Sequence, residues 1–309
     1  MKKLPKWDVA VLQAYYTAAK SMGQGAVASY IPALADIEPH LAVAVTDLEG
    51  YTYSTGASRE RFTIQSISKV LILAAALEEA GFKKVFCCVG MEPTGDAFNS
   101  IVRLETSGAI PSNPMINAGA IAVTSCIQGK TAEERFNKVR NLARRIFDSP
   151  ELDYDVKIYR SELQNSARNQ ALAYMLEAGN VISGSVSEHL EVYLKACSLS
   201  ANCEEISYLG AVLANNGVLP RTGEQIIEAE NARTIRALMT TCGLYDYSGE
   251  FAVRVGIPAK SGVGGGIMSA VPNRVGIGTY CPLLDSKGNS ICGLRALERL
   301  SEIESLSIL

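Results

Sequence analysis

The sequence contains few of the side chains from which metal sites are built. Only two histidines, His40 and His189, occur in 309 residues, and no two of the eight cysteines have C-x-x-C spacing. Structural zinc sites use four cysteine or histidine ligands, and the adjacent residues Cys87 and Cys88 are poorly spaced to bind one ion together. We therefore expect no metal site, and we expect cysteines that are mostly buried free thiols.

The sequence also lacks an excess of charge of one sign. Its 29 basic and 32 acidic residues give a formal net charge of -3 and are scattered along the chain. The densest basic stretch, Lys138 to Arg145, alternates with Val139, Leu142 and Ile146 at helical spacing, which is typical of an amphipathic helix. Nucleic acid is therefore not an expected partner.

Long apolar runs are absent as well. The longest uninterrupted run, Val70 to Leu77, is much too short to cross a bilayer, which takes about 20 residues. The basic start of the chain, Met1 to Lys6, is similar to that of a signal peptide, but Asp8 and Gln13 interrupt the apolar stretch that follows. We therefore expect no membrane partner, a start that the mature protein retains, and a cytoplasmic location.

The composition itself is that of a globular protein, with 48% hydrophobic and 20% charged residues. A chain of 309 residues can form two domains, or one sheet domain with a helical insertion. Strand patterns occur towards both ends: 41–45 and 51–54, which form a predicted hairpin, 61–64, 252–255, 266–271 and 275–281.

Between these end segments the pattern is mainly helical. Residues 66–80 are almost all apolar and predict a buried helix that Gly81 ends, and other helices are expected at 7–21 and from Leu294. We predict an α/β (α+β) fold in which a mostly antiparallel sheet comes from both chain ends, with an inserted helical domain. The sheet part would be 1–65 plus 236–309 and the helical part 66–235, in one unit with its functional site in the cleft between them.

One S-x-x-K motif, Ser66 to Lys69, stands where a predicted strand leads into the buried helix. Residues three apart share a helix face, so Lys69 can reach the Ser66 hydroxyl, and the helix N-terminus offers unpaired N–H groups to a developing oxyanion. This arrangement indicates nucleophilic catalysis. Taken alone, a serine at a helix start fits an N-cap better.

The only K-[ST]-G motif, Lys260-Ser261-Gly262, precedes a glycine-rich turn and a predicted strand. Alone it indicates a turn into an edge strand. Serine acyl enzymes that recognise penicillin combine both motifs in this order, on a helix and on the adjacent strand. A cationic Lys260 would also disfavour the protonated form of Lys69. Neither histidine carries a motif that supports a Ser-His-Asp triad, so both are expected to be structural.

Further motifs extend this pattern along most of the chain. They are Tyr30-Ile31-Pro32, Gln65-Ser66-x-x-Lys69, Glu92-Pro93-Thr94-Gly95, Asn113 to Ile121, Ser161-Glu162, Arg168-Asn169, Gly243 to Asp246, Ser248-Gly249 and Pro258 to Val263. With them the sequence resembles the serine-dependent glutaminases, which share the β-lactamase-like fold, from about Tyr30 to Gly293. The resemblance implies an amidohydrolase that converts free glutamine to glutamate and ammonia.

The resemblance also implies roles for individual residues. Ser66 would be the nucleophile that forms an acyl-enzyme and Lys69 its base, with the backbone N–H groups of Ser66 and Val263 as the oxyanion hole. Glu162 would bind the substrate ammonium, and Tyr245, or less favourably Tyr193, would pass a proton to the departing ammonia. The expected substrate-binding residues are Tyr30, Gln65, Asn117, Glu162, Asn169, Tyr193, Lys260 and Ser261.

The resemblance implies no metal and no organic cofactor, and it implies a homodimer or homotetramer. Residues 163–167 depart from the more polar run of the family, so one wall of the pocket is expected to differ. Taken singly, an asparagine such as Asn117 fits a helix cap equally well.

Two alternatives stay open at this point. The first is a penicillin-recognising peptidase or β-lactamase, which acts outside the membrane and would need a secretion signal. The second is a non-catalytic binding domain of the same fold, against which the presence of both Lys69 and Lys260 argues.

Overall fold

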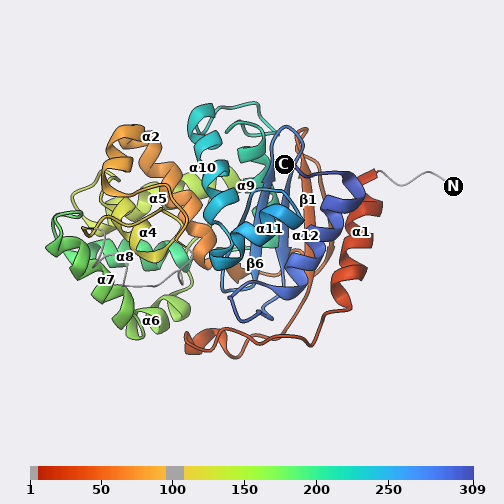
Figure 1. Cartoon of the computed structure of the whole chain (residues 1–309), viewed down its shortest axis with the longest axis horizontal. Coiled ribbons are helices and arrows are strands. Elements are labelled where there is room, and N and C mark those ends of the chain that lie inside the picture. Colours follow the sequence, from red (N-terminus) through yellow and green to blue (C-terminus); the bar gives the residue numbers. More distant parts are fainter. Residues whose placement is uncertain (1–5, 95–107) are drawn as a thin grey trace.

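The computed structural model describes residues 6–94 and 108–309 (Figure 1). Residues 1–5 of the basic start and Gly95 of the motif that begins at Glu92 lie outside the described residues. The α-helices are α1 (Lys6–Ala19), α2 (Ser68–Cys88), α4 (Asn117–Thr124), α5 (Ala132–Phe147), α6 (Val156–Gln164), α7 (Ala167–Ala178), α8 (Val186–Cys197), α9 (Cys203–Ala214), α10 (Ala229–Cys242), α11 (Ser248–Arg254) and α12 (Ile291–Glu304). The 3₁₀ helices are η1 (Pro32–Leu34), η2 (Gln65–Ile67) and η3 (Tyr245–Tyr247), and the strands are β1 (Ala42–Asp47), β2 (Thr52–Gly56), β3 (Phe62–Thr63), β4 (Ser200–Ala201), β5 (Ala259–Ser261), β6 (Gly266–Val271) and β7 (Val275–Tyr280).

Five strands form one antiparallel sheet in the order β2-β1-β7-β6-β5. Two of them come from the N-terminal part of the chain and three from the C-terminal part. Ala42 in β1 pairs with Gly56 on one side and with Tyr280 on the other, which joins the two chain ends in the middle of the sheet. The predicted fold class, with its antiparallel sheet from both ends and its helices in between, is confirmed.

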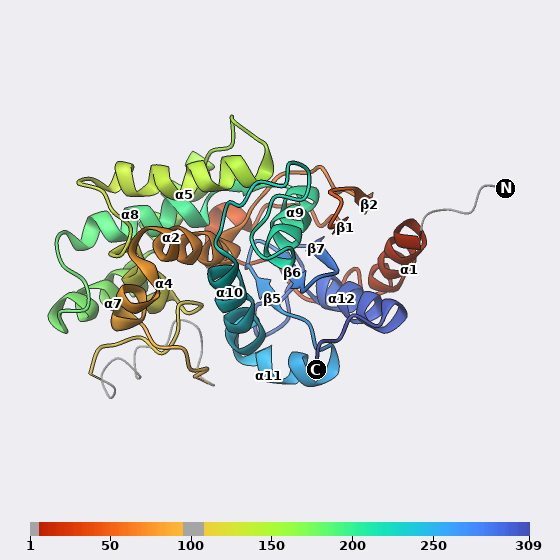
Figure 2. The same ribbon diagram turned by 90° about the horizontal axis from the view of Figure 1, so that it is seen from above.

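Helices cover both faces of this sheet, with α9 on one face and α1 and α12 on the other (Figure 2). Because successive side chains of a strand point to opposite faces, Ala44 of β1 packs into the core under α9 while Val43 and Val45 pack into the core under α1 and α12. The core under α9 continues into the helices around α2. Helix α9 of the helical part thus packs on the sheet, and the packing marks no boundary between the two parts. The domain division at residues 66 and 235 stays a prediction.

Helix α9 approaches the sheet closely because glycines face each other there. A Cβ on Gly276 of β7 would come within 1.9 Å of the backbone nitrogen of Ala211, and one on Gly210 would come within 2.2 Å of the Ser269 oxygen. Any larger side chain would push the helix off the strands.

Helix α2 is the buried helix that the sequence predicts. Its first ten residues, 68–77, are all buried, because α4, α5, α8 and α10 pack around it (Figure 1). The helical geometry breaks at Gly81, which has φ 77° and ψ 162°, as predicted, but a further helical segment then continues to Cys88.

The strand predicted at 252–255 is wrong, because residues 252–254 belong to α11. The alternation of apolar and charged residues there matched a strand, yet Val253 is 89% exposed while Phe251 and Val255 are buried. Burial at positions four apart is the helical period.

The other local predictions hold with changed details. The basic stretch 138–145 lies in the amphipathic helix α5, and the last helix starts at Ile291, three residues earlier than predicted. The strand at 61–64 is present as β3, but it pairs with β4 in a separate two-stranded sheet. Strand β4 lies in the region predicted as helical, and two residues are too few for a recognisable pattern.

Candidate active site

Ser66 lies where β3 leads through η2 into the buried helix α2, as the S-x-x-K motif predicts. The residue before it, Gln65, has φ 48°, a left-handed conformation that costs a non-glycine residue free energy. Ser66 is the second residue of η2, so its N–H comes too early to have an acceptor within the helix. This N–H is therefore placed to bind an anionic oxygen.

Lys69 is fully buried one turn after Ser66. Its Nζ donates to Oδ1 of Asn117 at 2.7 Å, and Nδ2 of Asn117 donates to Oδ1 of Asn169 at 3.0 Å. This chain of hydrogen bonds joins α2, α4 and α7. Burial lowers the pKa of Lys69 to about 8, although the negative potential of Glu162 opposes the change. The neutral amine is therefore accessible near neutral pH, as a general base requires.

Lys260 of β5 is also fully buried, and its Nζ donates to the Ser261 carbonyl oxygen at 2.6 Å. Burial lowers its pKa well below the ordinary lysine value, and the charge of Lys69 lowers it further. The expected repulsion between the two lysines thus lowers the pKa of Lys260, whereas burial is the main cause of the lowered pKa of Lys69.

Tyr245 connects the K-S-G strand to the nucleophile. Its hydroxyl donates to the Ser261 carbonyl oxygen at 3.2 Å and is hydrogen-bonded with the Ser66 side chain, and Nζ of Lys260 lies 4.7 Å from its ring centre. Burial raises the pKa of Tyr245 despite the hydrogen bond with Ser66, so the phenol is protonated at neutral pH. Tyr193 of α8 is buried too, with its ring centre 6.0 Å from Nζ of Lys69.

Val263 lies in the turn between β5 and β6, directly beside the segment that carries Ser66. The neighbouring Gly262 is pressed so closely against this segment that a Cβ on it would lie 2.4 Å from the Ile64 carbonyl oxygen. Gly262 and Gly265 donate the hydrogen bonds of this turn, so the turn in the described structure does not depend on the Val263 N–H. The geometry brings the two expected oxyanion-hole segments together.

A cavity of about 240 Å³ opens in front of Ser66. It is lined by Tyr30, Gln65, Ser66, Asn117, Glu162, Asn165, Arg168, Asn169, Tyr193 and Cys197. Seven of these ten are residues that the sequence analysis assigned to the site. The other assigned residues, Lys69, Tyr245, Lys260, Ser261 and Val263, do not line the cavity but adjoin Ser66 or the β5–β6 turn.

Three lining residues, Asn165, Arg168 and Cys197, were not assigned from the sequence. Arg168 precedes Asn169 in a motif that was noted, and Asn165 lies in the run that departs from the family. Cys197 follows Tyr193 by four positions on α8, a helical spacing that places both on one face and that could have indicated it.

Glu162 places a buried carboxylate in this cavity. Burial raises its pKa to about 7, while the charge of Lys69 and a hydrogen bond from Gln65 act in the opposite direction. Within residues 6–94 and 108–309, its Oε2 atom is buried without a hydrogen-bond partner. An unpaired buried acceptor of this kind favours a cationic ligand group.

Tyr30 closes the cavity on the side of the N-terminal segment. The residue is 54% exposed, yet burial raises the pKa of its hydroxyl well above the ordinary value, and Tyr245 and Glu162 add to the effect. Tyr30 is thus a lining residue of the cavity that stays more than half exposed to solvent.

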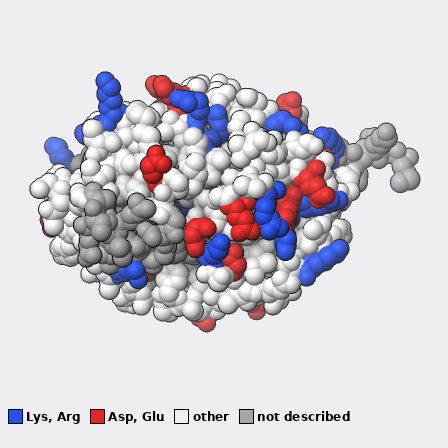
Figure 3. Space-filling view, viewed as in Figure 1, with Lys and Arg blue, Asp and Glu red and all other residues white. Residues whose placement is uncertain are grey.

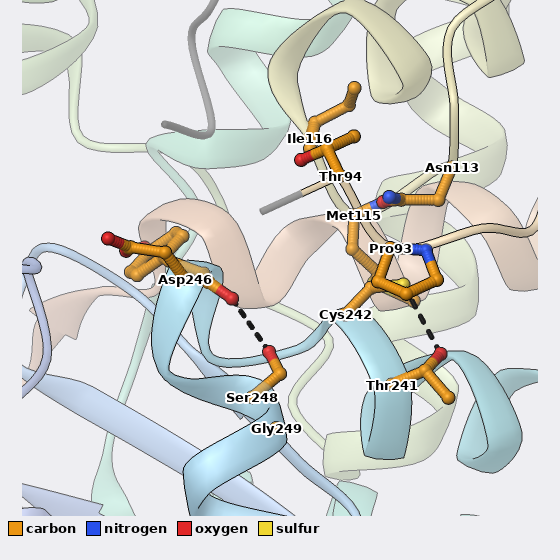
Figure 4. A pocket seen from close by; sticks show the side chains of 11 residues that line it. Pro93, Thr94, Asn113, Met115, Ile116, Thr241, Cys242, Asp246, Ser248 and Gly249 are labelled. Atoms are coloured by element: carbon orange, nitrogen blue, oxygen red, sulfur yellow. Dashed lines mark hydrogen bonds between the residues drawn. The ribbon is translucent and has the colours of Figure 1, made fainter. Parts of the chain in front are cut away.

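A second cavity, of about 130 Å³, is shown in Figure 4. Residues 93–94, 113, 115–116, 241–242, 245–246 and 248–249 line it. Ser248 and Gly249 lie below Asp246 in the view of Figure 4. Tyr245 thus lines this second cavity and does not line the cavity in front of Ser66.

Residues 6–94 and 108–309 hold no cluster of three or more histidine, cysteine, aspartate or glutamate side chains that could bind a metal, and none of their helices is long and apolar enough to cross a membrane. Basic and acidic side chains are interspersed on the face shown in Figure 3.

Both histidines have structural contacts, as expected. His189 is buried, hydrogen-bonded through Nδ1 to Thr124 and through Nε2 to the Ser183 carbonyl oxygen, and burial lowers its pKa. His40 pairs with Glu60 at the surface.

The chain has close relatives among known proteins. The family model described as Glutaminase matches residues 25–309. A glutaminase from Alkaliphilus oremlandii is 49% identical over 286 residues, which cover 92% of this chain and 94% of that protein. A solved structure of the probable glutaminase YbaS matches with a TM-score of 0.94 and 36% identity, covering 99% of both chains. The Bacillus subtilis glutaminase YbgJ, solved as a covalent complex with 5-oxo-L-norleucine formed from 6-diazo-5-oxo-L-norleucine, matches with a TM-score of 0.86 and 36% identity over 98% of both chains.

Proposed function

The chain belongs to the glutaminase family, an amidohydrolase family, and we propose that Ser66 is the nucleophile with which it hydrolyses glutamine. The observation that carries the proposal is the environment of Lys69, a buried lysine one turn from Ser66 whose pKa is lowered to about 8. Its neutral amine takes the proton of the Ser66 hydroxyl as Oγ attacks the side-chain carbonyl carbon of glutamine.

The tetrahedral intermediate carries its negative charge on the former carbonyl oxygen. The backbone N–H groups of Ser66 and Val263 are proposed to bind this oxygen, and each such donor typically contributes about 3 to 4 kcal/mol. The C–N bond then breaks, and the nitrogen leaves as ammonia with a proton passed on by the Tyr245 phenol, which is hydrogen-bonded with Ser66. The proton that Lys69 took from Ser66 replaces the one that Tyr245 gives.

Water completes the cycle. It attacks the acyl-enzyme ester, gives one proton to Lys69, and releases glutamate when the bond to Ser66 Oγ breaks and Oγ regains its proton. The reaction consumes one water and yields one glutamate and one ammonia, with no cofactor assigned a step.

Glutamine binding is assigned to the polar lining of the 240 Å³ cavity. The ammonium would lie against Glu162, whose unpaired Oε2 offers a charged acceptor, and the Tyr30 hydroxyl and the amides of Asn117 and Asn169 would hold the carboxylate and the ammonium. Gln65 and Tyr193 complete the enclosure, while Lys260 and Ser261 support Tyr245 from the strand.

The nucleophile can be identified directly with 6-diazo-5-oxo-L-norleucine, the compound that forms a covalent complex with the Bacillus subtilis relative. Attack by Ser66 Oγ on the carbon that bears the diazo group releases dinitrogen and leaves a 5-oxonorleucyl group on the serine. Peptide mass spectrometry should locate this group on Ser66 in the wild type, and Ser66→Ala should not be labelled. Labelling of a cysteine, for example Cys197, in place of Ser66 would contradict the proposal.

Glu162→Gln should lower kcat/KM for glutamine by tens to hundreds of fold. The change keeps size and hydrogen-bonding capacity but removes the negative charge, so the desolvated ammonium loses a partner that contributes roughly 2 to 4 kcal/mol. The carboxylate forms as the pH rises through about 7, so wild-type kcat/KM should fall below that pH and the mutant should lack this step.

The substrate specificity of the wild type and of Glu162→Gln gives a sharper test of the role of Glu162. Glutamine with an acylated amino group should be a very poor substrate for the wild type, and Glu162→Gln should discriminate against it much less. The exposed Glu177 of α7 supplies a matched control, since Glu177→Gln should change neither value. An unchanged ratio of kcat/KM for the two substrates in Glu162→Gln would remove Glu162 from the site.

The homodimer or homotetramer and the cytoplasmic location that were expected from the sequence stay predictions. Sedimentation of the purified chain would determine the oligomeric state.

A further inference from the structure

The backbone at Tyr245 has a conformation that its own side chain disfavours. Tyr245 has φ 57°, in the left-handed region, where a residue with a Cβ is less stable than glycine. A bulky aromatic residue persists there only when its surroundings hold it in place. The turn at 244–248 therefore needs a device that stabilises it.

The Ser248 hydroxyl is placed to be that device. Its Oγ accepts a hydrogen bond from the backbone N–H of Leu244 at 2.9 Å and donates one to the carbonyl oxygen of Tyr245 at 2.8 Å. Ser248 is buried, so water does not compete for these bonds. The Ser248 side chain thus binds two backbone groups, the N–H of Leu244 and the carbonyl of Tyr245. These groups flank the peptide bond between Leu244 and the left-handed Tyr245.

The turn in turn determines where the Tyr245 phenol lies. The tyrosine hydroxyl reaches Ser66 and the Ser261 carbonyl oxygen, both of which lie on other elements. Rotation of the Tyr245 backbone out of the left-handed region would swing the long side chain away from these partners. Ser248 itself does not line the cavity in front of Ser66, so it has no direct path to the substrate.

We propose that Ser248 is a positioning residue of the reaction, which acts by holding the backbone of Tyr245 so that its phenol points at Ser66. The proposal rests on the proposed role of Tyr245 in passing a proton to the departing ammonia. A simpler role competes with it: Ser248 begins α11, and a serine there can serve only to stabilise the start of that helix.

The two roles differ in what they predict for Ser248→Ala. If Ser248 positions Tyr245, the loss of both hydrogen bonds should lower kcat about 10- to 50-fold and leave KM for glutamine within about threefold, because proton transfer depends on geometry more than substrate binding does. If it only stabilises α11, the thermal midpoint of unfolding should fall while kcat of the folded enzyme stays near wild type.

A rescue variant and a control variant sharpen this comparison. Ser248→Thr keeps the hydroxyl, and the 130 Å³ cavity beside Ser248 has room for the added methyl group, so its kcat should stay within about threefold of wild type. Ser207 of α9 is the matched control: it is a buried serine that also donates to the carbonyl three residues earlier, that of Glu204, and it lines neither of the two cavities. Ser207→Ala should lower stability without a comparable fall in kcat.

A double-mutant cycle with Tyr245→Phe tests whether Ser248 acts through the phenol. Tyr245→Phe should lower kcat strongly, and adding Ser248→Ala to it should lower kcat by less than about twofold, because no hydroxyl is left to position. The proposal would be overturned if the kcat losses of the two single mutants multiplied in the double mutant. It would also be overturned if Ser248→Ala kept the wild-type kcat while Tyr245→Phe was slow. In either case the role of Tyr245 itself would stand. Wild-type kcat in Tyr245→Phe would instead refute the proton-transfer role of Tyr245, and the Ser248 proposal with it.

Discussion

Ser66→Ala should lower kcat for glutamine hydrolysis on the order of 10⁴-fold or more. The change removes the only atom that can form the proposed acyl-enzyme, while the cavity that binds the substrate keeps its shape and its polar groups. Glutamine binding to the mutant, measured by calorimetry, should therefore stay close to the value for wild type. The mutant also allows the binding of uncleaved glutamine to be measured at equilibrium.

The control for Ser66→Ala is its folded state, because Ser66 is buried beside a left-handed Gln65. Removal of one small hydroxyl leaves little empty space, so the thermal midpoint should change little. A Ser66→Ala protein that binds glutamine and also turns it over near the wild-type rate would refute the proposed mechanism.

Lys69→Ala should lower kcat by a similar factor, on the order of 10⁴-fold. Without the amine, the base one turn from Ser66 is gone, and Oδ1 of Asn117 also loses the donor of its hydrogen bond. Because the two residues act as one unit, the double mutant should be about as slow as either single mutant. A double mutant slower by the product of the two losses would show that they act independently.

The pH dependence of the wild type tests the same role of Lys69. The neutral amine is the active form, and burial lowers its pKa to about 8, so activity should rise as the pH increases through about 8. Lys69→Arg is the matched variant, since it keeps a positive charge but cannot lose its proton in this range, and it should be inactive at every pH. An active Lys69→Arg enzyme would contradict general-base catalysis by this residue.

The two motifs do not distinguish a glutaminase from a penicillin-recognising enzyme, because these enzymes differ in the pocket that binds the substrate. S-x-x-K and K-S-G are shared with penicillin-recognising enzymes, so they specify a serine acyl-transfer centre and no substrate. The match of the glutaminase model to residues 25–309 decides the substrate class. The buried carboxylate of Glu162 is the feature of this cavity that suits the ammonium of a free amino acid.

The predictions from sequence were most accurate where one chain segment contains all the relevant information. Ser66 and Lys69 are three residues apart at the start of one buried helix, and the spacing alone places them on one face. The wrong prediction at 252–255 also came from a short segment. A window of four residues fits a strand pattern, and the helical period becomes visible only when the burial of both Phe251 and Val255 is known.

The sequence by itself determined most of the helical and strand segments, the pair of lysines and the candidate nucleophile, since periodicity and short motifs act over a few residues. Only the tertiary structure decided that β3 pairs with β4, that Lys69 is hydrogen-bonded to Asn117, and that Tyr245 reaches Ser66 from a left-handed turn held by Ser248. These contacts join segments that lie far apart along the chain, and the shifted pKa values of Lys69 and Glu162 follow from burial, which exists only once those segments have packed together.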